Sequence, residues 1–182
     1  TRLAQLPRKL RGTPGLVAAA SVVAMSGLGG WIYYNTNIVN EYTTTLSRER
    51  DQAEYEQALI GYENVPQPRI SDVMLVVALY PDEPRAVTRG TYVIQNRTGQ
   101  PLDEVHVRWL KPLQMTKLEV EGAKLKQEHI GQDYRIYRFD RPMAPLEVRR
   151  IKFETLREQQ GFRNSDNERR IVDNGTFLDN TE

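Results

Sequence analysis

The sequence offers few side chains that could perform acid–base, nucleophilic or metal chemistry. Its two histidines are His106 and His129, and their separation matches neither H-E-x-x-H nor any other zinc-ligand spacing. The chain has no cysteine, which excludes thiolate nucleophiles, cysteine-ligated zinc and disulfides. We therefore predict no catalytic, cofactor-binding or metal-binding residue. We expect each histidine to be solvated or hydrogen-bonded, His106 within a strand and His129 in a polar loop.

Two pairs of adjacent carboxylates also invite a catalytic interpretation. They are Asp82 with Glu83, and Asp103 with Glu104. Both pairs fall at predicted turns or strand starts, where acids are common, so we assign them no role in catalysis. The sequence contains no G-x-S-x-G, phosphate-loop or G-x-G-x-x-G pattern. Two triplets that begin at Asn96 and Asn174 match the N-glycosylation pattern, and both also fit simple turns.

The longest apolar stretch precedes all of these residues. Residues 12–40 contain no charged side chain and no histidine, although 27% of the whole chain is charged. A helix of about 20 residues matches the thickness of a bilayer core. We predict a transmembrane helix over 12–40, with Trp31, Tyr33 and Tyr34 at its interfacial end. A cleaved signal peptide and a buried helix of a soluble protein are the alternatives.

The flanks of this helix set its expected orientation. Residues 1–11 carry four basic side chains and no acid, so the positive-inside rule makes them a cytoplasmic arm. We then expect residues 41–182 on the outer side of the membrane, in the periplasm or its equivalent. Small residues recur four apart in the helix, which suits packing against other transmembrane helices as well as lipid; a lone anchor with incidental glycines fits these residues equally. Outside the arm the chain has no basic field, so nucleic acid is not an expected partner.

The remaining residues predict a mainly β domain on a helical stalk. Residues 41–69 form the stalk and a linker, because helix formers run without glycine or proline until Gly61. From Ile70 the apolar period becomes two, and about seven strands separated by turns fit residues 70–157. We expect an antiparallel sandwich or saddle. A slip in the alternation at Arg149 and Arg150 indicates a β-bulge, and residues 158–182 are expected to be an irregular tail.

Several of these segments resemble a known group of proteins. Residues 29–37 (GGWIYYNTN), 62–70 (YENVPQPRI), 72–80, 90–96 and 172–177 (VDNGTF) resemble large bacterial membrane proteins. In that group an ABC-type transporter permease is fused to a domain of the aminopeptidase N family, the gluzincin metallopeptidases. The resemblance implies the last transmembrane helix of the permease, followed by the N-terminal β-domain of the peptidase-like module.

The resemblance places catalysis outside these residues. The family's H-E-x-x-H and Gly-x-Met-Glu-Asn motifs do not occur here, so zinc is expected only in a missing catalytic domain. The sequence begins with Thr1, and we expect it to be a piece of a longer protein. The expected function is a non-catalytic fragment that tethers and positions the peptidase-like module. The alternative is a single-span protein whose β-domain is a self-sufficient binding or assembly module of a transport complex.

Overall fold

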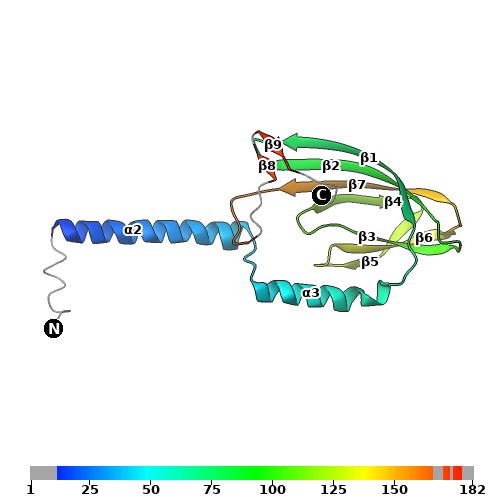
Figure 1. Ribbon diagram of the computed structural model, residues 1–182, viewed down its shortest axis with the longest axis horizontal. Coiled ribbons are helices and arrows are strands. Elements are labelled where there is room, and N and C mark those ends of the chain that lie inside the picture. Colours follow the sequence, from blue (N-terminus) through cyan, green and yellow to red (C-terminus); the bar gives the residue numbers. More distant parts are fainter. Residues whose placement is uncertain (1–11, 166–169, 173, 178–182) are drawn as a thin grey trace. The chain divides into compact units, whose positions relative to one another are not determined.

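The fold is taken from a computed structural model that describes residues 12–165, 170–172 and 174–177 (Figure 1). The chain divides into two compact units. One contains the chain up to Thr44 together with residues 160–167, and the other contains residues 45–159 and the segment from 168 onward. The fold is mainly β with antiparallel sheets, as the sequence predicted.

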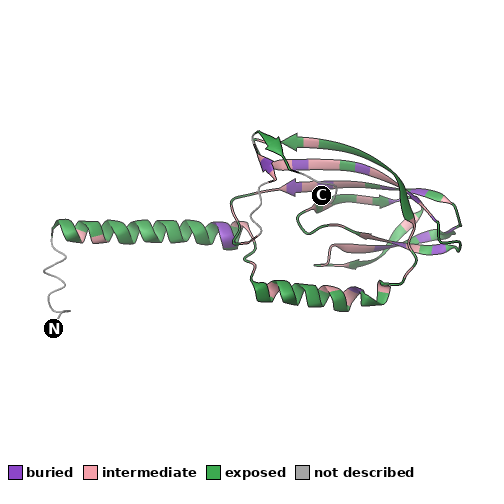
Figure 2. Ribbon diagram, in the orientation of Figure 1, coloured by how far each residue is buried: buried purple, intermediate pink, exposed green. Residues whose placement is uncertain are grey.

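The first unit is built on an apolar helix. Helix α2 (Thr13–Tyr33) starts with Pro14 in its first turn and continues as the π-helix η2 (Tyr34–Val39). No residue of α2 is buried, and Figure 2 shows it exposed along its length. The helix over Thr13–Val39 is long and apolar enough to cross a membrane, a test that a signal sequence also passes. The predicted arm, residues 1–11, lies outside the described part of the chain.

Polar side chains close the end of this helix. Asn35 is buried, and its side-chain amide donates to the carbonyl oxygen of Trp31 at 2.9 Å. Asn40 Nδ2 donates to the carbonyl oxygens of Asn35 (3.0 Å) and Gln160 (2.9 Å). Arg163 Nε donates to Asn40 Oδ1 at 3.0 Å. The Asn35 and Asn40 amides thus satisfy carbonyls near the end of the helix, and the Asn40 side chain also fastens residues 160–163 to it.

The body of the second unit is built from two larger antiparallel sheets. The four-stranded sheet has the order β1-β2-β7-β4, and the three-stranded sheet has the order β3-β6-β5 (Figure 1). The strands are β1 (Arg69–Tyr80), β2 (Arg85–Gln95), β3 (Leu102–Arg108), β4 (Gln114–Val120), β5 (Ala123–His129), β6 (Tyr134–Met143) and β7 (Val148–Glu158). Their facing apolar residues form one core, which contains Ile94, Leu102, Val105, Val120, Tyr137, Phe139, Met143 and Ile151. This arrangement is a β-sandwich.

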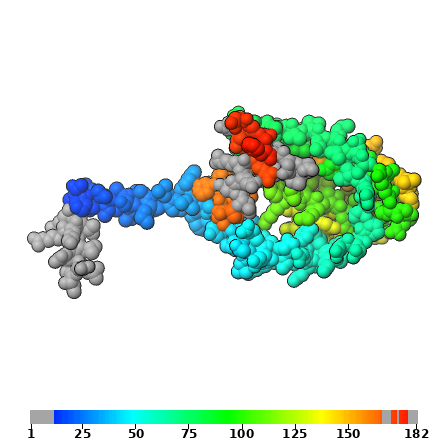
Figure 3. Space-filling view, in the orientation of Figure 1, coloured from blue at the N-terminus to red at the C-terminus, as the bar shows by residue number. Residues whose placement is uncertain are grey.

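The predicted stalk is a helix, and its last turns pack on the body. Helix α3 (Thr45–Leu59) is mostly exposed and ends in the short helix η3 (Ile60–Tyr62). Leu59 is buried, and the ring of Tyr55 lies 4.6 Å from the guanidinium of Arg108 on β3. In the space-filling view α3 (cyan) runs along one side of the β-strands (Figure 3). A stalk would stand free of the β-domain, whereas the end of this helix packs against it.

Two expectations about the strands were wrong. His129 ends strand β5, where we expected a polar loop, because β5 has too few apolar residues to show a period. The predicted bulge at Arg149 and Arg150 is absent, since β7 pairs with β2 without a shift from Val148 to Glu158. Arg149 instead takes an inward position and is buried. Its guanidinium lies 4.3 Å from the Phe139 ring centroid, and its Nε is 2.9 Å from a carboxylate oxygen of Glu147.

The expected irregular tail contains ordered structure. Strand β8 (Ile171–Val172) pairs with β9 (Gly175–Thr176). Ile171 is fully buried, and Gln159 Oε1 accepts hydrogen bonds from the backbone nitrogens of Arg170 (3.1 Å) and Ile171 (3.3 Å). This part of the tail is held on the second unit.

Candidate functional site

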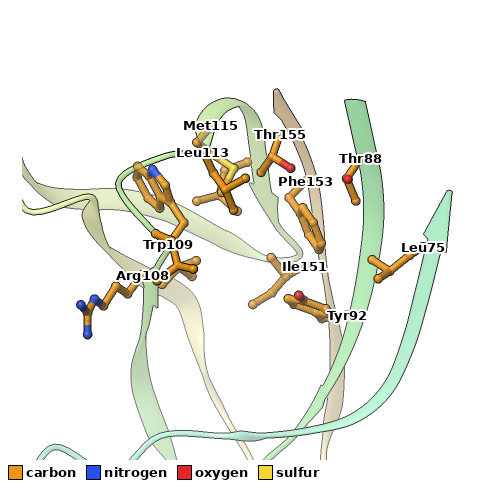
Figure 4. A pocket seen from close by; sticks show the side chains of 13 residues that line it. Leu75, Thr88, Tyr92, Arg108, Trp109, Leu113, Met115, Ile151, Phe153 and Thr155 are labelled. Carbon is orange, nitrogen blue, oxygen red and sulfur yellow. The ribbon is translucent and has the colours of Figure 1, made fainter. Parts of the chain in front are cut away.

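One feature of the β-domain that could accept another molecule is an apolar pocket on the inner face of the four-stranded sheet. Its volume is about 300 Å³. Side chains from β1, β2, β4 and β7 and from the β3–β4 connection line it, as Figure 4 shows. The lining residues are Leu75, Thr88, Tyr92, Val107, Arg108, Trp109, Leu110, Leu113, Met115, Leu118, Ile151, Phe153 and Thr155.

A glycine on β2 makes this pocket possible. Leu75, Gly90, Phe153 and Leu118 lie opposite one another across the four strands, so they share one face. A Cβ at Gly90 would lie 2.1 Å from Phe153 Cζ and 2.8 Å from Leu75 Cδ2. The missing side chain lets the phenyl ring lie over the backbone of β2. The ring also packs against Tyr92, with 4.6 Å between the centroids.

The lining favours binding of an apolar group over catalysis. It includes no carboxylate and no histidine, and its one charged side chain is Arg108. Burial raises the pKa of the Tyr92 phenol, so this hydroxyl stays protonated at neutral pH. The pocket therefore contains neither a general base nor an activated nucleophile. An aliphatic or aromatic side chain from another polypeptide fits it in chemistry and size.

The outer face of the three-stranded sheet carries the histidines. His106 on β3 has a side chain that is 5% exposed, and both of its ring nitrogens have partners. Nδ1 lies 2.5 Å from Tyr134 Oη, and Nε2 lies 3.2 Å from Glu104 Oε1. Tyr62 from η3 covers the group, with ring centroids 5.2 Å from His106 and 5.7 Å from His129. The two histidines thus lie around one tyrosine that anchors the end of α3.

The charges in this cluster determine which ring nitrogen of His106 carries a proton. A hydrogen bond from Lys126 Nζ, at 2.5 Å, is the main cause that lowers the pKa of Glu104, so the carboxyl is ionised and can only accept. His106 Nε2 therefore carries a proton and donates it to Glu104, while Nδ1 accepts from the Tyr134 hydroxyl. Burial lowers the pKa of His106 against the opposing effect of Glu104, so the ring is neutral at pH 7.

This geometry gives His106 a structural role. Both ring nitrogens are engaged and the side chain is out of solvent, so no lone pair is available to a metal or a substrate. Of the carboxylates noted in the sequence, Glu104 joins this cluster. Glu83 lies in the β1–β2 turn, 2.9 Å from Arg85 Nη2, and is not brought to it. Among the described residues, no group of three or more His, Asp or Glu side chains could hold a metal ion.

The two glycosylation triplets lie in turns. Asn96 is fully buried, and its Nδ2 donates to the carbonyl oxygens of Gln100 (2.7 Å) and Met143 (2.8 Å). Its Oδ1 accepts from the backbone nitrogen of Thr98 at 3.0 Å. In the fold this amide nitrogen is inaccessible to a glycosyl transferase. Asn174 is exposed in the turn between β8 and β9.

Comparison with known proteins finds a distant likeness in structure. No family model matches the chain, and no curated protein is significantly similar to it. Among solved structures, the chain is similar to an M1 zinc metallopeptidase from Deinococcus radiodurans, with a TM-score of 0.40 and 16% identity over 52% of this chain. A two-domain mutant M1 peptidase bound to L-arginine matches with the same values.

The match covers a small part of those enzymes. It spans 21% of the peptidase chain in both cases and 25% of a mutant of the Deinococcus radiodurans enzyme, over 56% of this chain. This similarity is too low to assign a family to the chain.

Proposed function

We propose that this chain is a non-catalytic membrane tether that positions a peptidase-like module. In this proposal α2 anchors the protein in a bacterial inner membrane, with the N-terminal arm in the cytoplasm and the β-domain in the periplasm. The peptidase-like assignment and the fusion to a transporter permease rest on the sequence resemblance of residues 29–37, 62–70 and 172–177.

The observation that carries the anchoring role is the surface of α2. Its large apolar side chains are exposed all round, with Leu16 and Val23 both more than 70% exposed. A helix that is apolar on every face needs an apolar surrounding, and lipid or neighbouring transmembrane helices supply one. The small residues of the helix favour close packing against other helices of a permease.

The positioning role is supported by the open half of the sandwich. The core lies at one end of the four-stranded sheet, whereas Val73, Leu75, Val77 and Leu79 line the inner side of β1 and are each more than 40% exposed. An apolar face of this kind is typical of a docking surface. We propose that a catalytic domain outside these residues covers it, and that any zinc belongs to that domain.

Membrane attachment is tested by extraction. Val22→Arg places a charge in the middle of α2 at a cost of about 3 kcal/mol in membrane insertion. We expect the native chain to stay with membranes at alkaline pH and a larger share of the variant to be released. Ala53→Arg on the exposed face of α3 is the matched control and should behave as the native chain. Full release of the native chain by alkali, or its cleavage after α2, would contradict the anchor.

The side of the membrane is tested by labelling. Lys124 on β5 has a side chain that is 83% exposed, and the chain has no other cysteine to react once Lys124→Cys is made. We expect a membrane-impermeant maleimide to label this residue in cells whose outer membrane is permeable to it. Labelling only after the inner membrane is broken would place the β-domain in the cytoplasm and overturn the proposed topology.

A second candidate is a self-sufficient β-module that binds or assembles with a transport complex. The observation that favours it is the tail, because Ile171 is fully buried and Gln159 holds the start of β8. Limited proteolysis separates the two proposals. Protection of the chain around Ile171 in the isolated protein favours the module, whereas rapid cleavage there favours a fragment that awaits its partner domain.

A further inference from the structure

Strand β1 forms an edge of the four-stranded sheet, and its sequence is unusual for an edge. Within the described residues, no strand pairs with its second side. From Val73 to Tyr80 it carries no charge, no proline and no glycine. Its pairing with β2 is regular over these residues, because the one register shift lies earlier, between Ile70 and Asp72. Soluble proteins usually protect such an edge with charges, proline or a bulge.

The other three edges of the two larger sheets carry charged side chains. Strand β4 carries Lys117 and Glu119, strand β5 carries lysines at 124 and 126, and strand β3 carries acids at 103 and 104. Each of these pairings has a register shift, as β1 does near its start, so the charged side chains are what distinguishes these three edges from β1. The contrast within one small domain indicates that another strand covers the edge of β1, so that this edge needs no charges for protection.

Both faces of β1 point to the same conclusion. The outer face carries Met74 (69% exposed) and Val76 (66% exposed), and the inner face carries Leu75 (47%) and Val77 (46%). A strand added at this edge would continue the backbone ladder and cover apolar side chains on both sides of the sheet. Eight residues of pairing span about 27 Å.

The charges at the two ends of β1 specify the occupant. Arg69 begins the strand, and Asp82 and Glu83 follow it in the turn. An antiparallel partner that is mostly apolar and places acids near Arg69 therefore matches this edge. The same segment of a second copy has this pattern. With Val76 opposite Val76, Leu75 faces Val77 of the other copy, and the Arg69 end of each strand lies near the acidic turn of the other.

We propose that two copies of this chain associate through antiparallel pairing of their β1 strands. The two-fold axis passes through Val76 perpendicular to the sheet, so the two inner faces lie on the same side. The eight strands then form one continuous sheet. This interface uses the edge of β1 and does not depend on the proposed peptidase partner, whose docking face is the inner side of the sheet.

Cysteine cross-linking of the full chain in detergent tests the pairing. Val76→Cys places two thiols opposite each other on neighbouring strands, within reach of a disulfide, and the native chain has no cysteine to compete. We expect oxidation to give a covalent dimer in Val76→Cys and a much smaller yield in Lys117→Cys on the β4 edge. The dimer yield should persist when excess empty micelles separate chains that share a micelle by chance.

A charge variant provides the second measurement. Val76→Lys brings two like charges opposite each other at the two-fold axis, and we expect it to weaken dimerisation about tenfold or more in sedimentation velocity. Thr91→Lys adds the same charge on the neighbouring strand β2, opposite Met74, and should leave the dimer intact. A monomeric native chain, equal disulfide yields at positions 76 and 117, or an unchanged dimer in Val76→Lys would overturn the proposal.

Discussion

Gly90→Ala is the most direct test of how the inner face of the sheet is built. In a strand, replacing glycine with alanine ordinarily stabilises a protein by about 0.5–1 kcal/mol. At position 90 the new Cβ would lie 2.1 Å and 2.4 Å from two ring carbons of Phe153 and 2.8 Å from Leu75 Cδ2. Carbon atoms in contact are normally separated by about 3.5–4.0 Å, so the ring must move by more than an ångström.

The balance between the steric clash and the gain in strand propensity decides whether Gly90→Ala raises or lowers the free energy of unfolding. Leu75 is 47% exposed and can turn away, but the Phe153 ring is packed against Tyr92. Overpacking of this kind costs about 1–3 kcal/mol. Combined with the gain in strand propensity, we expect Gly90→Ala to lower the free energy of unfolding by about 1–2 kcal/mol.

Urea unfolding of the full chain in mild detergent measures this loss. The chain has two tryptophans, so a Trp31→Phe background leaves Trp109 on the β-domain as the fluorescent reporter. In a Phe153→Leu background the clash is relieved, and Gly90→Ala should cost at least about 1 kcal/mol less than it does beside the phenyl ring. Gly61→Ala meets no atom within 4 Å and is the matched control. A Gly90→Ala variant as stable as the native chain would refute this account of the pocket.

Three further predictions concern polar groups. Because the pKa of His106 is lowered in the fold, the unfolded chain binds a proton that the folded chain does not. The free energy of unfolding should therefore fall as the pH drops below about 6.5. In urea titrations at several pH values, His106→Gln should make this dependence on pH weaker. Asn96→Ala removes two buried donated hydrogen bonds and should cost about 2–3 kcal/mol by thermal unfolding, whereas Asn174→Ala should stay within about 0.5 kcal/mol. Arg149→Met leaves the Glu147 carboxylate without its least exposed cation and should cost about 3 kcal/mol, part of which Glu147→Gln in the same chain restores.

The sequence predicted the elements whose apolar residues follow a clear period. The uncharged run gave the helix α2, and alternation located β1, β2, β3, β4, β6 and β7 to within a few residues. Strand β5 was missed because Leu125 is its one large aliphatic residue and the register shift beside it interrupts the alternation. Alternation also misled at Arg149, since an inward arginine looks like a slip until its partners are known. Its Nη2 donates to the carbonyl oxygen of Arg141 at 3.0 Å, which no pattern of residue types reveals.

The site was harder to predict than the strands for the same physical reason. The pocket depends on Gly90, Phe153 and Leu75, which lie on three strands and meet only through the register of the sheet. The cluster at His106 likewise draws Tyr62 from η3 and Tyr134 from β6. Polar and aromatic residues at these separations have no spacing that marks them in a sequence. A prediction would have required the pairing of β2 with β7 and of β3 with β6.

Helix α2 and strand β1 are both unusually exposed for apolar segments, but their backbones need different surroundings. Helix α2 and strand β1 both expose apolar side chains on every side. The helix satisfies its own backbone hydrogen bonds, so lipid alone is an adequate surrounding for it. The strand does not, because the outer edge of β1 presents free N–H and C=O groups that lipid cannot pair. An apolar surrounding is therefore enough for α2, whereas β1 needs a neighbour with a backbone of its own. For this reason we assign the edge of β1 to a second strand and not to the membrane.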